Sequence, residues 1–86
     1  MLILVAIEEE LKRQDLPNEV IEYVGVGKIN ATYNTLQAIH QHSPRTIINF
    51  GTAGSLDSKK SGLVEVSKFY QRDMDASPLG FEVGQT

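Results

Sequence analysis

Hydrophobic and polar positions alternate along the chain in blocks that predict several strands and one helix. Leu2 to Ala6 is continuously apolar, which is typical of a strand covered on both faces in a parallel sheet. Glu19 to Val24 predicts a second strand, and Thr46 to Phe50, rich in β-branched residues, predicts a third. Leu63 to Phe69 predicts a fourth strand further along the chain.

A helix is expected between the second and third strands. Gly25 and Gly27 interrupt the second strand, and helical spacing begins near Lys28. Ser43 and Pro44 should end the helix, because the residue before a proline disfavours helical geometry. Large apolar residues recur on one face and are expected to point into a core; they are Ile29, Tyr33, Leu36 and Ile39.

The order strand, strand, helix, strand, strand predicts an α/β fold with a mixed, centrally parallel sheet and a flanking helix. A chain of 86 residues has room for one small domain. The tail from Gln71 to Thr86 contains Pro78, Gly80 and Gly84 and is expected to be an irregular loop. Because no closing element follows, we expect residues 1–86 to be the N-terminal portion of a single larger α/β domain, truncated after Thr86.

Composition and charge exclude several classes of partner. The net charge is −3 and the sequence has no run of about five or more basic residues, so we expect no surface that binds nucleic acid or anionic lipid electrostatically. The absence of cysteine excludes disulfides and thiolate metal sites and fits a reducing compartment. The apolar opening runs into Glu8 without a basic leader and is too short to span a membrane. We therefore expect a cytoplasmic protein.

The residues that could carry chemistry follow the ends of three predicted strands. They are Ile7 to Glu10, Val24 to Lys28, and Phe50 to Ser55. In open α/β sheets, ligands bind beyond the carboxyl ends of the strands. If these strands are parallel neighbours, the three segments converge on one site.

Each segment has a structural interpretation beside the functional one. The acidic residues Glu8 and Glu9 could complement a helix N-terminus, while one carboxylate of the triplet could act as a general base for water. Gly25 to Lys28 matches neither a dinucleotide fingerprint nor a P-loop, so a structural turn explains it as well as a ligand-binding turn does. The small residues from Gly51 to Ser55 could admit a flat ligand or simply form a bulge.

The two histidines lie at the end of the predicted helix. His40 and His42 are two positions apart and do not share a helix face, so they are poorly placed to chelate a metal ion together. Favourable interaction with the helix C-terminus is the better account. We expect neither a metal ion nor a cofactor.

Taken in order, these segments resemble the 5′-methylthioadenosine/S-adenosylhomocysteine nucleosidases of the nucleoside phosphorylase and nucleosidase superfamily. That family opens with an Ala-Met-Glu-Glu-Glu type stretch, continues with a Gly-Ile-Gly-Lys turn and an Ile-Asn-x-Gly-Ser-Ala-Gly segment, and then has two aspartates before a Phe-Gly-Tyr-Glu-Tyr-Gly-Gln pattern. The matching residues here are Ala6 to Glu10, Gly25 to Lys28, Ile48 to Gly54, Asp73, Asp75, and Leu79 to Gln85.

The resemblance implies a phosphorylase/hydrolase-like three-layer fold and hydrolysis of the bond between adenine and ribose in a small purine nucleoside. It also implies residue roles by position. Glu10 would orient and activate the attacking water, and Ile7 and Val26 would border the ribose and its 5′ substituent. The residues that would line the purine side of the pocket are Thr52, Ala53 and Gly54.

Dimeric members of the family place the loop that corresponds to Leu79 to Gln85 near the subunit interface, so a homodimer is implied. The family supplies the proton for the leaving base from an aspartate in its C-terminal half, where a Met-Glu pair also holds the ribose hydroxyls. Residues 1–86 contain neither, and we expect this chain to be inactive alone.

Two departures from the family pattern leave the substrate open. The usual β-hairpin before the Gly-Lys turn is reduced to Lys12 to Glu19, and Gly62-Leu63 stands where the family has Gly-Asp. A purine nucleoside phosphorylase is an alternative, although Asn49 occupies the position of its phosphate-binding arginine and an acidic triplet disfavours phosphate. A non-catalytic module that binds adenine or serves in assembly is the other alternative.

Overall fold

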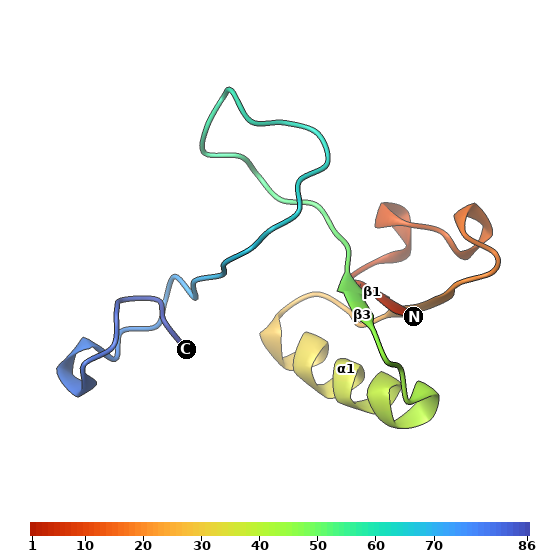
Figure 1. Ribbon diagram of the computed structural model, residues 1–86, viewed down its shortest axis with the longest axis horizontal. Coiled ribbons are helices and arrows are strands. Elements are labelled where there is room, and N and C mark those ends of the chain that lie inside the picture. The colour runs from red at the N-terminus through yellow and green to blue at the C-terminus, as the bar shows by residue number, and fades with distance from the viewer. The chain divides into compact units, whose positions relative to one another are not determined.

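Three short strands form a single parallel sheet in the computed structural model, which describes residues 1–86. The strands are β1 (Leu2–Val5), β2 (Val20–Tyr23) and β3 (Ile47–Asn49), and their order in the sheet is β2-β1-β3. Both neighbours of β1 run parallel to it. The α/β fold with a parallel centre is therefore confirmed, and the first three predicted strands are each correct to within about one residue at either end (Figure 1).

The central strand β1 is buried along its whole length, as its continuous apolar sequence predicts. Its side chains alternate between the two faces of the sheet, as in any strand. On one face the buried cluster consists of Leu2, Leu4, Val24 and Ala38. On the other face it consists of Ile3, Val5 and Ile21, with Leu11, Tyr23 and Phe50 packed against it.

The helix α1 (Lys28–His42) joins β2 to β3 and covers the first of these faces. It begins after Gly27, whose φ of 96° is accessible to glycine at little cost. It ends where Ser43 adopts a left-handed conformation and its N–H donates to the carbonyl of Ile39 at 2.8 Å. In the last turn, Nε2 of His42 lies 2.9 Å from Oε1 of Glu22, which ties the helix end to β2.

The prediction that the large apolar stripe of α1 faces a core is wrong. Small residues face the sheet instead: Ala38 is 4% exposed and Ala31 packs against the same cluster. The stripe is on the open side of the helix, with exposed fractions of 86% for Ile29 and 63% for Tyr33; Leu36 and Ile39 are also exposed. Small side chains allow α1 to approach the sheet closely, and this close approach determines which face is buried.

The opposite face of the sheet is covered by the chain that follows β1. No hairpin forms there; two 3-10 turns, Glu8–Glu10 and Arg13–Asp15, occupy this stretch. The guanidinium of Arg13 lies 4.7 Å from the ring centroid of Tyr23, a cation–π contact, and the Tyr23 hydroxyl donates to the carbonyl of Leu11 at 2.7 Å. These contacts fasten the short connection to β2.

The chain divides into two compact units, Met1–Gly54 and Ser55–Thr86. The second unit contains no strand, so the strand predicted for Leu63 to Phe69 is wrong. Its apolar side chains are exposed, and no neighbouring strand supplies the ladder bonds that a strand requires. The tail is irregular, as predicted, apart from a 3-10 turn at Ser77–Leu79. The assignment of residues 1–86 to one larger domain stays a prediction.

None of the helices is both long and apolar enough to cross a lipid bilayer.

Candidate functional site

The three strand ends are held side by side by backbone hydrogen bonds that continue beyond the sheet. Next to β2, the N–H of Val24 donates to the carbonyl of Val5 at 2.8 Å, and the N–H of Gly25 donates to the carbonyl of Ala6 at 3.0 Å. Next to β3, the N–H of Phe50 donates to the carbonyl of Leu4 at 2.9 Å. The segments that follow the three strands therefore start from one edge of the sheet, as the parallel arrangement predicts.

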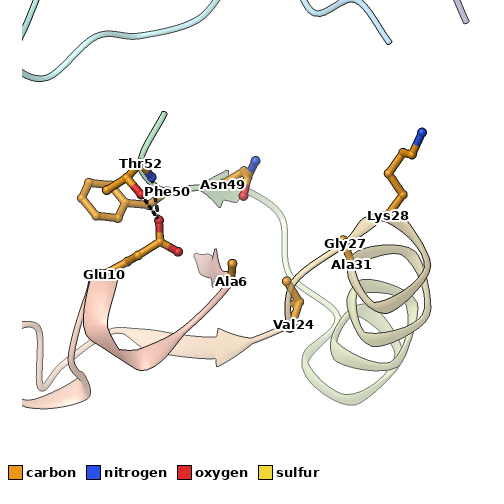
Figure 2. A pocket seen from close by; sticks show the side chains of 11 residues that line it. Ala6, Glu10, Val24, Gly27, Lys28, Ala31, Asn49, Phe50 and Thr52 are labelled. Carbon is orange, nitrogen blue, oxygen red and sulfur yellow. Dashed lines mark hydrogen bonds between the residues drawn. The ribbon is translucent and has the colours of Figure 1, made fainter. Parts of the chain in front are cut away.

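An open pocket of about 370 Å³ lies at this edge. Its volume falls within the range of small-molecule sites. The lining comes from all three strand ends and from the first turn of α1 (Figure 2). The lining residues are Ala6, Glu10, Val24, Gly25, Gly27, Lys28, Ala31, Asn49, Phe50, Gly51 and Thr52.

Glu10 contributes the acidic group of this pocket. Its 3-10 turn follows β1 directly, and the Glu10 N–H donates to the carbonyl of Ile7 at 3.1 Å. Oε2 of Glu10 accepts two hydrogen bonds from Thr52, one from the backbone N–H at 2.6 Å and one from the hydroxyl at 2.8 Å (Figure 2). The two other glutamates of the triplet, Glu8 and Glu9, are exposed and do not line the pocket.

The electrostatics of Glu10 follow from this double contact. The hydroxyl of Thr52 and then its backbone N–H stabilise the ionised carboxylate and lower the pKa of Glu10 below its ordinary value of 4.5. Partial desolvation opposes this lowering of the pKa, and a hydrogen bond with the backbone of Ile7 adds to it. Glu10 is therefore ionised at neutral pH and has one preferred orientation.

Gly51 lies close to the Glu10 carboxylate. A Cβ atom added at Gly51 would lie 3.2 Å from Oε2 of Glu10, which is tighter than about nine in ten real Cβ contacts. The absence of a side chain at this position lets the strand end pass beside Glu10. This gives one of the small residues after β3 a physical role that its sequence pattern alone does not reveal.

The structure brings some of the predicted site residues together and leaves others at the margin. Glu10 and Thr52 line the pocket and contact each other, although the resemblance assigned Thr52 to the purine side. The remaining four are exposed and do not line it. Ile7, Val26 and Ala53 are each adjacent in sequence to a lining residue, whereas Gly54 is two positions beyond Thr52. Their proposed roles stay predictions.

Three lining residues lie outside the three candidate segments of the sequence analysis: Ala6, Ala31 and Asn49. Asn49 is the last residue of β3. The signal for Ala6 was its place as the last residue of the first predicted strand. Ala31 lies one turn into α1, on the face that approaches the sheet. No group of three or more His, Asp or Glu side chains in the chain could hold a metal ion.

Comparison with known proteins places this chain in a family. The family model described as the phosphorylase superfamily matches residues 16–86. A protein of Staphylococcus haemolyticus named 5′-methylthioadenosine/S-adenosylhomocysteine nucleosidase is 35% identical over 68 residues, covering 77% of this chain and 30% of that protein. Proteins with the same name from Staphylococcus aureus and Staphylococcus carnosus are 43% and 41% identical over the same coverage.

The chain spans about 30% of the length of these curated relatives. No solved structure matches it significantly. The family model covers most of the chain, including the helix, the strand end that carries Thr52, and the second unit. By this match the chain belongs to the phosphorylase superfamily.

Proposed function

We propose that this chain contributes part of the active site of a purine nucleosidase, which hydrolyses the N-glycosidic bond of nucleosides of the 5′-methylthioadenosine/S-adenosylhomocysteine type. The names of its relatives support this reaction. The observation that carries the proposal is the Glu10 carboxylate, which Thr52 holds at the pocket formed by three parallel strand ends.

Hydrolysis of a glycosidic bond passes through a transition state with oxocarbenium-ion character, so it needs a positioned water, a carboxylate and a protonated leaving base. One oxygen of Glu10, Oε2, is engaged by Thr52. The other oxygen is proposed to orient the water. A carboxylate with a lowered pKa is a weak base at neutral pH. Its main contributions are therefore orientation of the water and attraction of the developing positive charge on the sugar.

Substrate contacts beyond Glu10 are proposed from the resemblance. Ile7 and Val26 would border the ribose and its 5′ substituent, and Ala53 and Gly54 would lie on the purine side. The proton donor and the ribose-binding pair are proposed to come from parts of the family fold outside residues 1–86. Cytoplasmic location and a homodimer, with the loop at Leu79 to Gln85 near its interface, complete the proposal.

Water is favoured over phosphate as the nucleophile because of the charge in the pocket. An ionised Glu10 would repel a phosphate dianion at short range. The end of β3 supplies Asn49 to the lining, and this side chain is uncharged. Phosphorolysis would require a cationic side chain that offsets Glu10. The lining contains one cationic residue, Lys28, on the wall opposite Glu10, and its amine points away from the Glu10 carboxylate (Figure 2).

A chimera tests the proposal. This chain replaces the matching segment of the Staphylococcus aureus relative, and adenine release from 5′-methylthioadenosine is measured with and without inorganic phosphate. We expect release that needs no phosphate, and no release from the 86-residue chain alone. Release that requires phosphate would show a phosphorylase. An inactive but folded chimera, with adenine bound by the 86-residue chain, would favour the binding module.

A further inference from the structure

The turn between β2 and α1 is held by two asparagine side chains of α1. The amide of Asn34 donates to the carbonyl of Val24 at 2.8 Å, and the amide of Asn30 donates to the carbonyl of Val26 at 2.9 Å. A carbonyl can only accept, so in both contacts the Asn side chain must present its NH₂ group. The two asparagines are four residues apart and therefore lie on the same face of the helix.

Both accepting carbonyls lie where regular secondary structure provides no donor. β2 ends at Tyr23, one residue before Val24, and α1 begins at Lys28, two residues after Val26. The first carbonyl is partly buried, where an unsatisfied acceptor is costly. The side chains of α1 thus complete the hydrogen bonding of a segment that belongs to neither element.

Gly25 makes room for this arrangement. A Cβ atom at Gly25 would lie 3.2 Å from Cβ of Asn30, and its φ of +87° is one that side chains rarely adopt. Gly27, with a φ of +96°, gives the turn its second sharp change of direction. Two flexible glycines would leave the turn loosely defined. The asparagine bonds on either side of Gly25 restrict it.

We propose that Asn30 and Asn34 are positioning residues that clamp the Val24 to Lys28 turn at the edge of the pocket. This turn supplies Val24, Gly27 and Lys28 to the pocket wall opposite Glu10 (Figure 2). Asn34 holds its start and Asn30 holds its middle. The effect of the clamp on ligand binding rests on the proposed function, in which the ligand is a purine nucleoside. The clamp itself does not rest on that function.

Amide hydrogen exchange of the full 86-residue chain tests the clamp without any ligand. Asn34→Asp keeps the shape of the side chain and removes its donor. We expect the Gly25 amide, which donates to the Ala6 carbonyl next to the turn, to exchange about threefold to tenfold faster relative to the amides of β1. Gln37→Ala, an exposed amide side chain on the same helix, should leave this ratio unchanged.

Equal acceleration of the Gly25 and β1 amides would overturn the clamp, because it would show a loss of global stability only. An unchanged exchange rate in both Asn34→Asp and Asn30→Asp would overturn it as well. The ligand arm compares the KM for 5′-methylthioadenosine when the same substitutions are made in the chimera. A KM raised by Asn34→Asp, but not by Gln37→Ala, supports the positioning role. An inactive chimera would count against the proposed function, whereas the exchange ratio in the 86-residue chain would still decide the clamp.

Discussion

At the scale of single residues, the three consecutive glutamates after β1 differ only in where the 3-10 turn places them. Glu10 meets Thr52, which lies 42 positions later in the chain, while Glu8 and Glu9 remain exposed. The sequence predicts that one carboxylate can enter the site, but it cannot select one from the residue types, because all three are identical. The selection depends on a long-range contact that exists only in the fold.

We expect Thr52→Val to raise the pKa of Glu10 toward 4.5, because the hydroxyl of Thr52 is the largest cause of its lowering. The shift should be partial, since the backbone N–H remains. A carboxyl-carbon NMR titration measures it. Asp75, whose pKa is lowered mainly by its hydrogen bond with the Ser77 side chain, serves as an internal control and should not move. An unchanged Glu10 titration in the variant would contradict the contact.

The same contact gives stability a pH dependence. Because the pKa of Glu10 is lower in the folded state, its contact with Thr52 stabilises the fold above pH 4.5. That contribution is lost as the pH falls through the folded-state pKa. In Thr52→Val the free energy of unfolding should therefore fall less steeply as the pH drops below 4.5. Its dependence on pH near neutrality should be unchanged.

Gly51→Ala tests the close approach of the β3 end to Glu10. The added Cβ would lie 3.2 Å from Oε2, so the flexible Glu10 side chain is expected to move and its bonds to Thr52 to weaken. The pKa of Glu10 should rise, with a stability change within about 0.5 kcal/mol as for other surface substitutions. Chemical denaturation and the carboxyl titration measure the two effects. A large loss of stability with an unchanged Glu10 pKa would refute this account.

At the scale of elements, sequence patterns located the strands and the helix well but could not orient the helix. Continuous apolar runs locate the strands, and Gly25 and Pro44 indicate where β2 and α1 end. Such boundaries can be predicted because they depend on local chemistry. Helical periodicity identifies an apolar stripe without showing what lies opposite it. In α1 the sheet accepts the alanine face, led by Ala38, and the large residues point away. The strand predicted for Leu63 to Phe69 failed for a related reason, because a strand depends on a partner as well as on its own residues.

Two substitutions distinguish the observed orientation of α1 from the predicted one. Ala38→Leu adds bulk against β1 and should destabilise the fold by about 1–3 kcal/mol. Leu36→Ala removes a side chain that is 55% exposed and should cost much less than the roughly 2–5 kcal/mol of a buried leucine. Urea unfolding measures both. The reverse order of effects would show that the apolar stripe faces the core after all.

At the scale of the whole molecule, the chain belongs to the phosphorylase superfamily but spans only about 30% of its relatives. The pocket is built entirely within the unit Met1–Gly54. That unit supplies one carboxylate, an orienting threonine and several small residues. It supplies no group that we assign to protonation of the leaving base, so the proposed reaction needs residues from elsewhere in the family fold.

The central claim, that Glu10 is the catalytic carboxylate, is tested most directly by kcat/KM for adenine release in the chimera described above. Glu10→Gln is compared with Glu9→Gln, its exposed neighbour of the same residue type. We predict a loss of about 10²-fold or more for Glu10→Gln, as is usual when a group positioned to stabilise charge in the transition state is removed, and a change of less than about twofold for Glu9→Gln. Equal effects of the two substitutions, or near-full activity of Glu10→Gln, would contradict the claim.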